Sequence, residues 1–274
     1  SGKDSSKLRD QIIAILTTYQ TKDLNLDDDQ VENIFTGEQH SFILTTKGKV
    51  FAFGTGEKGQ LGFTDYLFKS KPVDITSLFQ LVGNEKIKQI SCGDDFNIVL
   101  TSTNRVLSFG NKEKGQLGIE KDVLHEKIYD ISSSFDLSDG DYIIDIKCGA
   151  SHTLALSKNG TLYGWGDNSL SQLTSNNDLI VYTPTIIKGI EAPITKIECG
   201  RNTSYVLTNQ NQLFGFGSDS SGQLATHDPL LTSSKKDKPF LMNPSFDFES
   251  DERGHVWSLW ADALNNFLKL ISKL

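Results

Sequence analysis

The sequence contains few cysteines and no long apolar run, and both absences restrict the class of protein. Its 274 residues include three cysteines, Cys92, Cys148 and Cys199, an odd number without C-x-x-C spacing. That pattern argues against a disulfide framework and a zinc site, and it favours a reducing compartment. No stretch approaches 18 consecutive apolar residues, so we expect no transmembrane helix. The polar start, Ser1–Asp4, lacks the apolar core of a signal peptide, so we expect a cytoplasmic protein.

The sequence also lacks an excess of positive charge, since acidic residues outnumber basic ones and the formal net charge is −8. A negative field repels phosphate groups, which argues against binding to nucleic acid or to an anionic membrane. The one short basic cluster, Lys235-Lys236-Asp237-Lys238, is interpreted as a solvated loop.

Motifs of conventional catalysis are missing as well. The sequence has no H-E-x-x-H, no P-loop, no G-x-S-x-G and no cysteine paired locally with a histidine. The segment Gly54–Gly59 spells G-x-G-x-x-G, but it follows a strand and opens no helix, so we interpret it as a turn. The histidines lack metal-ligand spacing; they are His40, His125, His152, His227 and His255. We therefore expect no metal, no cofactor and no covalent catalysis.

What the sequence does contain is a repeat of about 50–56 residues. Four copies align without gaps: a first Gly stands at positions 37, 93, 149 and 200, and a Gln at 60, 116, 172 and 223. Both series step by 56, 56 and 51 residues. A decayed fifth copy begins at Gly254, where Trp257–Trp260 and Asn265–Leu270 replace the two strands. A short C-terminal amphipathic helix is the alternative for this last segment.

The repeat predicts an all-β fold, a β-propeller of about five blades. In each copy two apolar runs are joined by a tight turn, which indicates a hairpin. Further β-rich segments, such as Tyr142–Lys147, bring the count to about four strands per repeat, which is typical of a propeller blade. Helical solenoids would require long stretches of 3.6-residue periodicity.

We expect a single domain over residues 3–274. The repeats are placed near 37–91, 92–147, 148–198 and 199–250. Residues 251–274 are predicted to form a closing blade together with N-terminal strands from residues 8–36, which include Val31–Phe35. Such a closure removes exposed sheet edges. Residues 8–19 also have helical spacing, so a helix is an alternative there.

Repeated positions suggest structural roles. Each cysteine directly precedes the first Gly of a repeat, which indicates equivalent core positions. The Gln of the Gly-Gln-Leu turn can satisfy backbone groups of that turn, and its Gly can supply positive φ. His40 and His152 occupy one repeat position and are expected to be buried hydrogen-bonding residues.

Two segments, His152–Asn168 (with G-T-L-Y-G-W-G-D-N) and Phe109–Gly118 (F-G-N-K-E-K-G-Q-L-G), resemble the regulator-of-chromosome-condensation repeat family. The resemblance covers about residues 31–226 strongly. The founding member of that family is a seven-bladed exchange factor for the small GTPase Ran that also binds chromatin through basic elements. This chain is shorter and acidic, so the resemblance implies a Ran or Rab-type GTPase partner without chromatin binding, and a monomer. Family members include bacterial effectors, and the shortened ring suggests one, acting in the host cytosol.

The resemblance also implies a site. In the exchange factor an Asp directly after the first Gly of one repeat contributes to exchange, and here Asp94 matches it, with Asp95 beside it. Equivalent rim positions are Glu38, Ala150 and Arg201. The alternative is that both aspartates cap a turn.

Two long segments could also reach a partner. The first, residues 119–142, contains Asp122, His125, Glu126, Lys127 and Asp136; the second, residues 226–249, contains His227, Lys235 and Lys236. Acidic residues of the first segment would suit a partner rich in Lys or Arg. A non-catalytic propeller that binds another protein is the alternative to an exchange factor.

Overall fold

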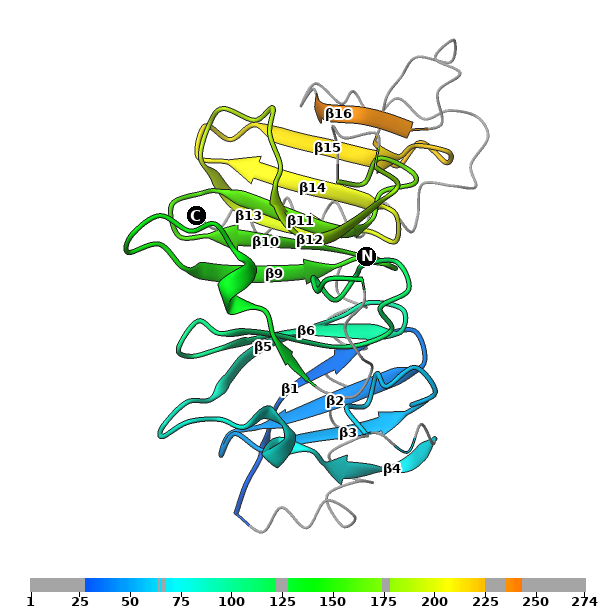
Figure 1. Cartoon of the computed structure of the whole chain (residues 1–274), viewed down its shortest axis with the longest axis vertical. Helices are drawn as coiled ribbons and strands as arrows, with labels where there is room; N and C mark the ends of the chain where they lie inside the picture. The colour runs from blue at the N-terminus through cyan, green and yellow to red at the C-terminus, as the bar shows by residue number, and fades with distance from the viewer. Residues whose placement is uncertain are drawn as a thin grey trace, which may run out of the picture. The chain divides into compact units, whose positions relative to one another are not determined.

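The computed structural model describes residues 28–63, 65, 68–121, 128–173, 178–224 and 235–242. Residues Asp29–Met242 form one compact unit built from four antiparallel sheets of four strands each. Figure 1 shows these sheets following one another from β1–β4 to β13–β16. No helix of the described residues is long and apolar enough to cross a membrane.

In every sheet the strands lie in chain order. The first sheet contains β1 (Val31–Thr36), β2 (His40–Thr45), β3 (Val50–Gly54) and β4 (Lys69–Asp74). The second contains β5 (Ile87–Cys92), β6 (Phe96–Thr101), β7 (Val106–Gly110) and β8 (Tyr129–Asp130). The third contains β9 (Ile143–Cys148), β10 (His152–Ser157), β11 (Leu162–Asp167) and β12 (Ile180–Ile186). The fourth contains β13 (Ile194–Cys199), β14 (Thr203–Thr208), β15 (Leu213–Ser218) and β16 (Lys235–Leu241). Two 3₁₀ turns, η1 (Thr76–Phe79) and η2 (Ser132–Ser134), follow the first two sheets.

The prediction of an all-β propeller is confirmed, and four blades fall within the described residues. One strand of the predicted closing blade is corrected, because Val31–Thr36 pairs with β2 in the first sheet, with Phe35 opposite Phe42. The reason is that each blade takes its first strand from the residues that precede its first Gly. The other residues predicted for the closing blade, 8–27 and 251–274, lie outside the described residues.

The first strands lie toward the axis of the blades, because neighbouring first strands contact one another: β1 with β5, β5 with β9, and β9 with β13. Apolar cores then form between successive sheets. Phe42 and Ala52 of the first sheet share one core with Val99 and Phe109 of the second. Burying each such side chain contributes about 1.5–3 kcal/mol. The blades are thus held together by apolar cores between successive sheets.

The Gln residues of the repeated turn have the predicted role. In each copy the Gln Oε1 accepts a hydrogen bond from the backbone N–H two residues earlier, at 2.7–2.9 Å: Gln60 from Lys58, Gln116 from Lys114, Gln172 from Leu170 and Gln223 from Ser221. The Gln carbonyl oxygens tie neighbouring blades together. Gln60 accepts from Asn97 Nδ2 at 2.8 Å and Gln172 accepts from Ser204 Oγ at 2.6 Å.

The three cysteines occupy equivalent core positions, as predicted, at the ends of β5, β9 and β13. All three are free thiols. Cys148 Sγ donates to the carbonyl oxygen of Ser91 at 3.3 Å. Burial raises the pKa of each thiol, that of Cys148 to about 12. The thiols are therefore protonated and unreactive at neutral pH.

A buried carboxylate fastens the hairpin of the second blade. Arg105 Nη1 donates to Glu85 Oε2 at 2.8 Å, and Arg105 Nε donates to Asp130 Oδ2 at 2.8 Å. The Glu85 side chain is only 1% exposed. Burial favours the protonated form, but hydrogen bonds from Thr101, Thr103, a backbone amide and Arg105 outweigh it and lower the pKa of Glu85 to about 2.

This depressed pKa predicts a pH-dependent contribution to stability. Glu85 stabilises the fold above its ordinary pKa of 4.5, and this contribution is lost as the pH falls toward about 2. Since one pKa unit corresponds to about 1.4 kcal/mol, Glu85→Gln should destabilise the protein by about 2–3 kcal/mol at pH 7. Urea denaturation should show this difference shrinking between pH 5 and pH 3. A difference that does not depend on pH would contradict the assignment.

Candidate functional site

One end of the blades, here called the loop face, collects the connections that carry the candidate residues. It contains the loops between first and second strands (37–39, 93–95, 149–151, 200–202) and the turns that follow the third strands (55–62, 111–118, 168–173, 219–224). The hairpin face, at the other end, contains the turns between second and third strands (46–49, 102–105, 158–161, 209–212). Because strands alternate in direction within each sheet, all four blades send equivalent loops to the same face.

The residues after the first Gly of each repeat form a continuous rim on the loop face. The backbone N–H of Glu38 donates to the Asp94 carbonyl at 3.4 Å, Asp94 to Ala150 at 3.1 Å, and Ala150 to Arg201 at 2.8 Å. The preceding glycines permit this close approach. A Cβ on Gly149 would lie 2.7 Å from the Gly200 carbonyl oxygen. The predicted adjacency of the four rim residues is confirmed.

Asp94 and Arg201 form an ion pair across the rim. Arg201 Nη2 lies 2.9 Å from Asp94 Oδ2, and Nη1 donates to Oδ1 at 3.4 Å. The pair joins the second blade to the fourth. Burial raises the pKa of Asp94, Arg201 acts to lower it, and the charge of Glu38 raises it further. The side chain of Asp94 is 24% exposed, whereas that of Arg201 is 66% exposed.

Other charges of the loop face are also engaged in pairs between side chains. Asp95 accepts a hydrogen bond from Asn111 Nδ2 at 2.7 Å. Lys114 Nζ lies 2.7 Å from Asp167 Oδ2 of the next blade. The Asp94 side chain thus contacts Arg201, and the Asp95 side chain contacts Asn111. The alternative interpretation was that both aspartates cap a turn. These charged side chains of the loop face are thus paired with polar partners.

The two repeat histidines are buried hydrogen-bonding residues, as predicted. His40 Nε2 lies 2.7 Å from Asn97 Oδ1, and His152 Nε2 lies 3.0 Å from Ser204 Oγ, each in the following blade. Burial lowers the pKa of both rings, that of His152 to about 4, so both are neutral at pH 7. They fasten neighbouring blades. Within the described ranges, no group of three or more His, Cys, Asp or Glu side chains could hold a metal ion.

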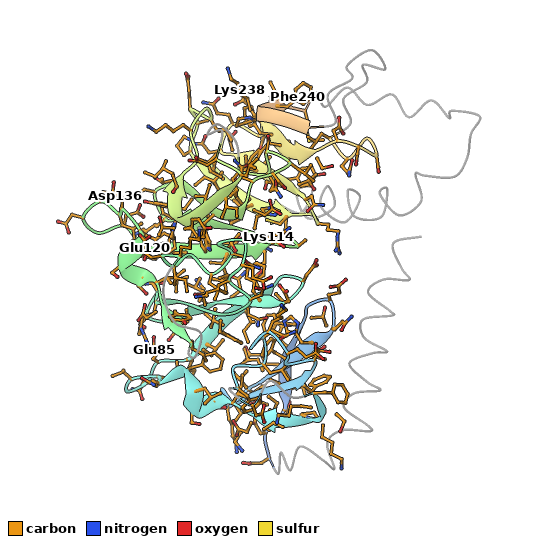
Figure 2. The ribbon with its side chains drawn as sticks, turned by 45° about the vertical axis from the view of Figure 1, so that its right-hand side comes forward. Glu85, Lys114, Glu120, Asp136, Lys238 and Phe240 are labelled. Carbon is orange, nitrogen blue, oxygen red and sulfur yellow. The ribbon has the colours of Figure 1, made fainter. Side chains whose placement is uncertain are left out.

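The remaining candidates do not all join the rim. Asp122, His125, Glu126 and Lys127 lie outside the described residues, as does His227. Asp136 follows η2 at the hairpin face and is exposed; it is labelled in Figure 2 together with Lys114 of the loop face.

The segment Lys235–Lys238 is corrected from a solvated loop to part of β16. This strand is the outermost of its sheet and pairs with β15, Gly217 lying opposite Lys236. Sequence reasoning also missed the contact between Arg201 and Asp94. The two residues are 107 positions apart, and the repeat indicates equivalent places without showing which side chains meet.

Comparison with known proteins identifies the family. The family model for the RCC1-like domain matches residues 4–256, so the chain belongs to the RCC1-like propellers.

Among curated proteins, the chain is 33% identical over 199 residues to "Probable E3 ubiquitin-protein ligase HERC6" of Homo sapiens, covering 71% of this chain and 19% of that protein. It is 28% identical over 242 residues to the secretion-regulating guanine nucleotide exchange factor of Bos taurus, covering 84% of this chain and 48% of the relative. The chain thus spans less than half the length of these relatives.

Among solved structures, the fold is similar to Prp20p of Saccharomyces cerevisiae, studied for its binding to Gsp1p and histones. The TM-score is 0.62 at 21% identity, over 81% of this chain and 53% of that one. At this identity the likeness shows the fold alone.

Proposed function

We propose that this chain regulates a small GTPase of the Ran or Rab type, acting as a guanine-nucleotide exchange factor through its loop face. It does so as a monomeric scaffold that supplies no covalent chemistry. An exchange factor binds the nucleotide-free GTPase more tightly than the loaded form, and this differential binding releases nucleotide. Such a function requires an ordered docking surface and no catalytic constellation.

The observation that carries the proposal is the rim itself. Backbone hydrogen bonds link Glu38, Asp94, Ala150 and Arg201 in one line, and an ion pair joins the side chains of Asp94 and Arg201 along it. A rigid, charged surface binds with little loss of conformational entropy. The relative named as an exchange factor, which matches 84% of this chain, supports the same function.

A second candidate is a binding module without exchange activity. The relative named as a ubiquitin ligase supports it, since the match spans only 19% of that protein and so concerns one region of a larger chain. In this case the loop face would hold a protein partner without altering its nucleotide affinity.

Release of fluorescent mant-GDP from a panel of Ran and Rab-type GTPases tests the proposal. We expect the wild-type chain to accelerate release from one of them, and Asp94→Ala to reduce that acceleration about fivefold or more, because the charge pair of the rim is lost. Asp136→Ala removes an exposed carboxylate at the hairpin face and is the matched control; it should leave the rate unchanged. Stable binding without release would favour the binding module. The absence of both would contradict any GTPase function.

A further inference from the structure

We infer that Arg201 is the rim side chain that contacts the partner, through a carboxylate of that partner, and that Asp94 acts behind it as a positioning residue. This inference rests on the proposed function and reverses the roles that the sequence resemblance implies. It begins from the unequal exposure of the pair, 66% for Arg201 against 24% for Asp94. A docking protein meets the guanidinium first.

The geometry of the pair prepares Arg201 for such a contact. Two guanidinium nitrogens face the two carboxylate oxygens of Asp94, at 2.9 and 3.4 Å, which holds the plane of the guanidinium in one orientation. An arginine has five N–H donors, so donors remain for a second acceptor. A long side chain that is already ordered loses less entropy when it binds, and arginine is among the residues that dominate interface energies.

The surroundings leave Arg201 accessible. Ala150 lies between the two charged residues in the rim, and its methyl group is too short to cover the guanidinium, which stays 66% exposed. Asp95 is held by Asn111, and Lys114 is held by Asp167 of the next blade. Arg201 is the one cation among the four rim residues, and its side chain is 66% exposed against 53% for Lys114.

The neighbouring charges indicate what kind of surface brings that carboxylate. The charges of Glu38 and Asp95 both act to raise the pKa of Asp94, and the whole chain carries a net charge of −8. This field attracts a basic surface and repels an acidic one. The fitting partner therefore presents one carboxylate for Arg201 within a predominantly basic surface.

A double-mutant cycle on binding to nucleotide-free Ran and Rab-type GTPases tests the inference. Arg201→Ala should raise the dissociation constant about 30-fold, the size expected for a hot-spot arginine. Asp94→Asn should raise the dissociation constant about fivefold, because the ion pair that orients the Arg201 side chain is lost. The double variant should match Arg201→Ala alone within about twofold, because Asp94 acts only through Arg201. Asp136→Asn is the control on the hairpin face.

The outcomes separate this inference from the proposed function. If the two losses multiply in the double variant, Asp94 contacts the partner directly and the positioning role is wrong, while the proposed function stands. If Arg201→Ala binds as tightly as the wild type, Arg201 does not contact the partner and the inference is wrong, while the proposed function stands. If the wild-type chain binds none of the GTPases, the proposed function fails, and this inference fails with it.

Discussion

Replacing Gly166 with alanine is expected to leave little folded protein, with a loss of about 4 kcal/mol or more in the free energy of unfolding. Gly166 lies in β11 with φ of +105°. A Cβ there would lie 2.4 Å from the Ser151 carbonyl oxygen and 2.8 Å from the His152 Cα. Both contacts are backbone atoms, and His152 is paired with Gly166 across the sheet. Neither can move away without opening the blade.

Gly140→Ala is the matched control for this prediction. Gly140 also has a positive φ, +76°, but a Cβ there would meet no atom within 4 Å. This variant should therefore lose only the about 1–2 kcal/mol that a left-handed backbone costs a residue with a side chain. Urea denaturation of the two variants measures the difference. Equal losses would show that the close approach to Ser151 has no energetic consequence.

Trp165→Ala is expected to cost about 3–5 kcal/mol of unfolding free energy. Trp165 is fully buried in the core between the second and third sheets, with its ring against that of Phe135 at 5.7 Å between centroids. Its Nε1 donates to the Gln116 carbonyl oxygen at 2.9 Å. The substitution removes both the packing and the tie between two blades, and leaves a cavity.

Trp165→Phe separates these two contributions. It keeps an aromatic ring in the core but removes the donor to Gln116, so we expect a loss of about 1–2 kcal/mol. The midpoint of urea unfolding should fall for both variants, and more for alanine. A phenylalanine variant as unstable as the alanine variant would mean that packing contributes little at this position.

The repeat made much of this fold predictable from the sequence. A side chain that recurs at a fixed repeat position must satisfy the same local requirement each time. The Gln recurs in four copies, the Cys in three and the His in two, and the bonds of Gln60 and Gln116 within their turns, the positions of the cysteines and the burial of His40 and His152 follow from that recurrence. The same reasoning placed Asp94 and its equivalents on one rim.

Other features could not be predicted because they depend on which neighbour an element meets. Val31–Thr36 precedes the first Gly of its repeat. The sequence does not say whether this strand pairs with the hairpin that follows it, as it does, or with strands of a closing blade. The strand Lys235–Leu241 contains three lysines and Pro239, which suit an outer edge but resemble a loop in sequence.

The electrostatics of the site were also hidden from the sequence. Arg201 and Asp94 stand two repeats apart, with Ala150 between them in the line of rim residues, and the repeat alone does not show that their side chains meet.

Hydrogen–deuterium exchange of the chain, alone and with the nucleotide-free GTPase found in the release screen, tests the docking surface most directly. We predict slower exchange in the loop-face turns 111–118 and 168–173 in the complex. The hairpin-face turns 102–105 and 158–161 should exchange as in the free chain. Protection of the hairpin turns, with the loop-face turns unchanged, would contradict the assignment of the loop face as the surface that binds the partner.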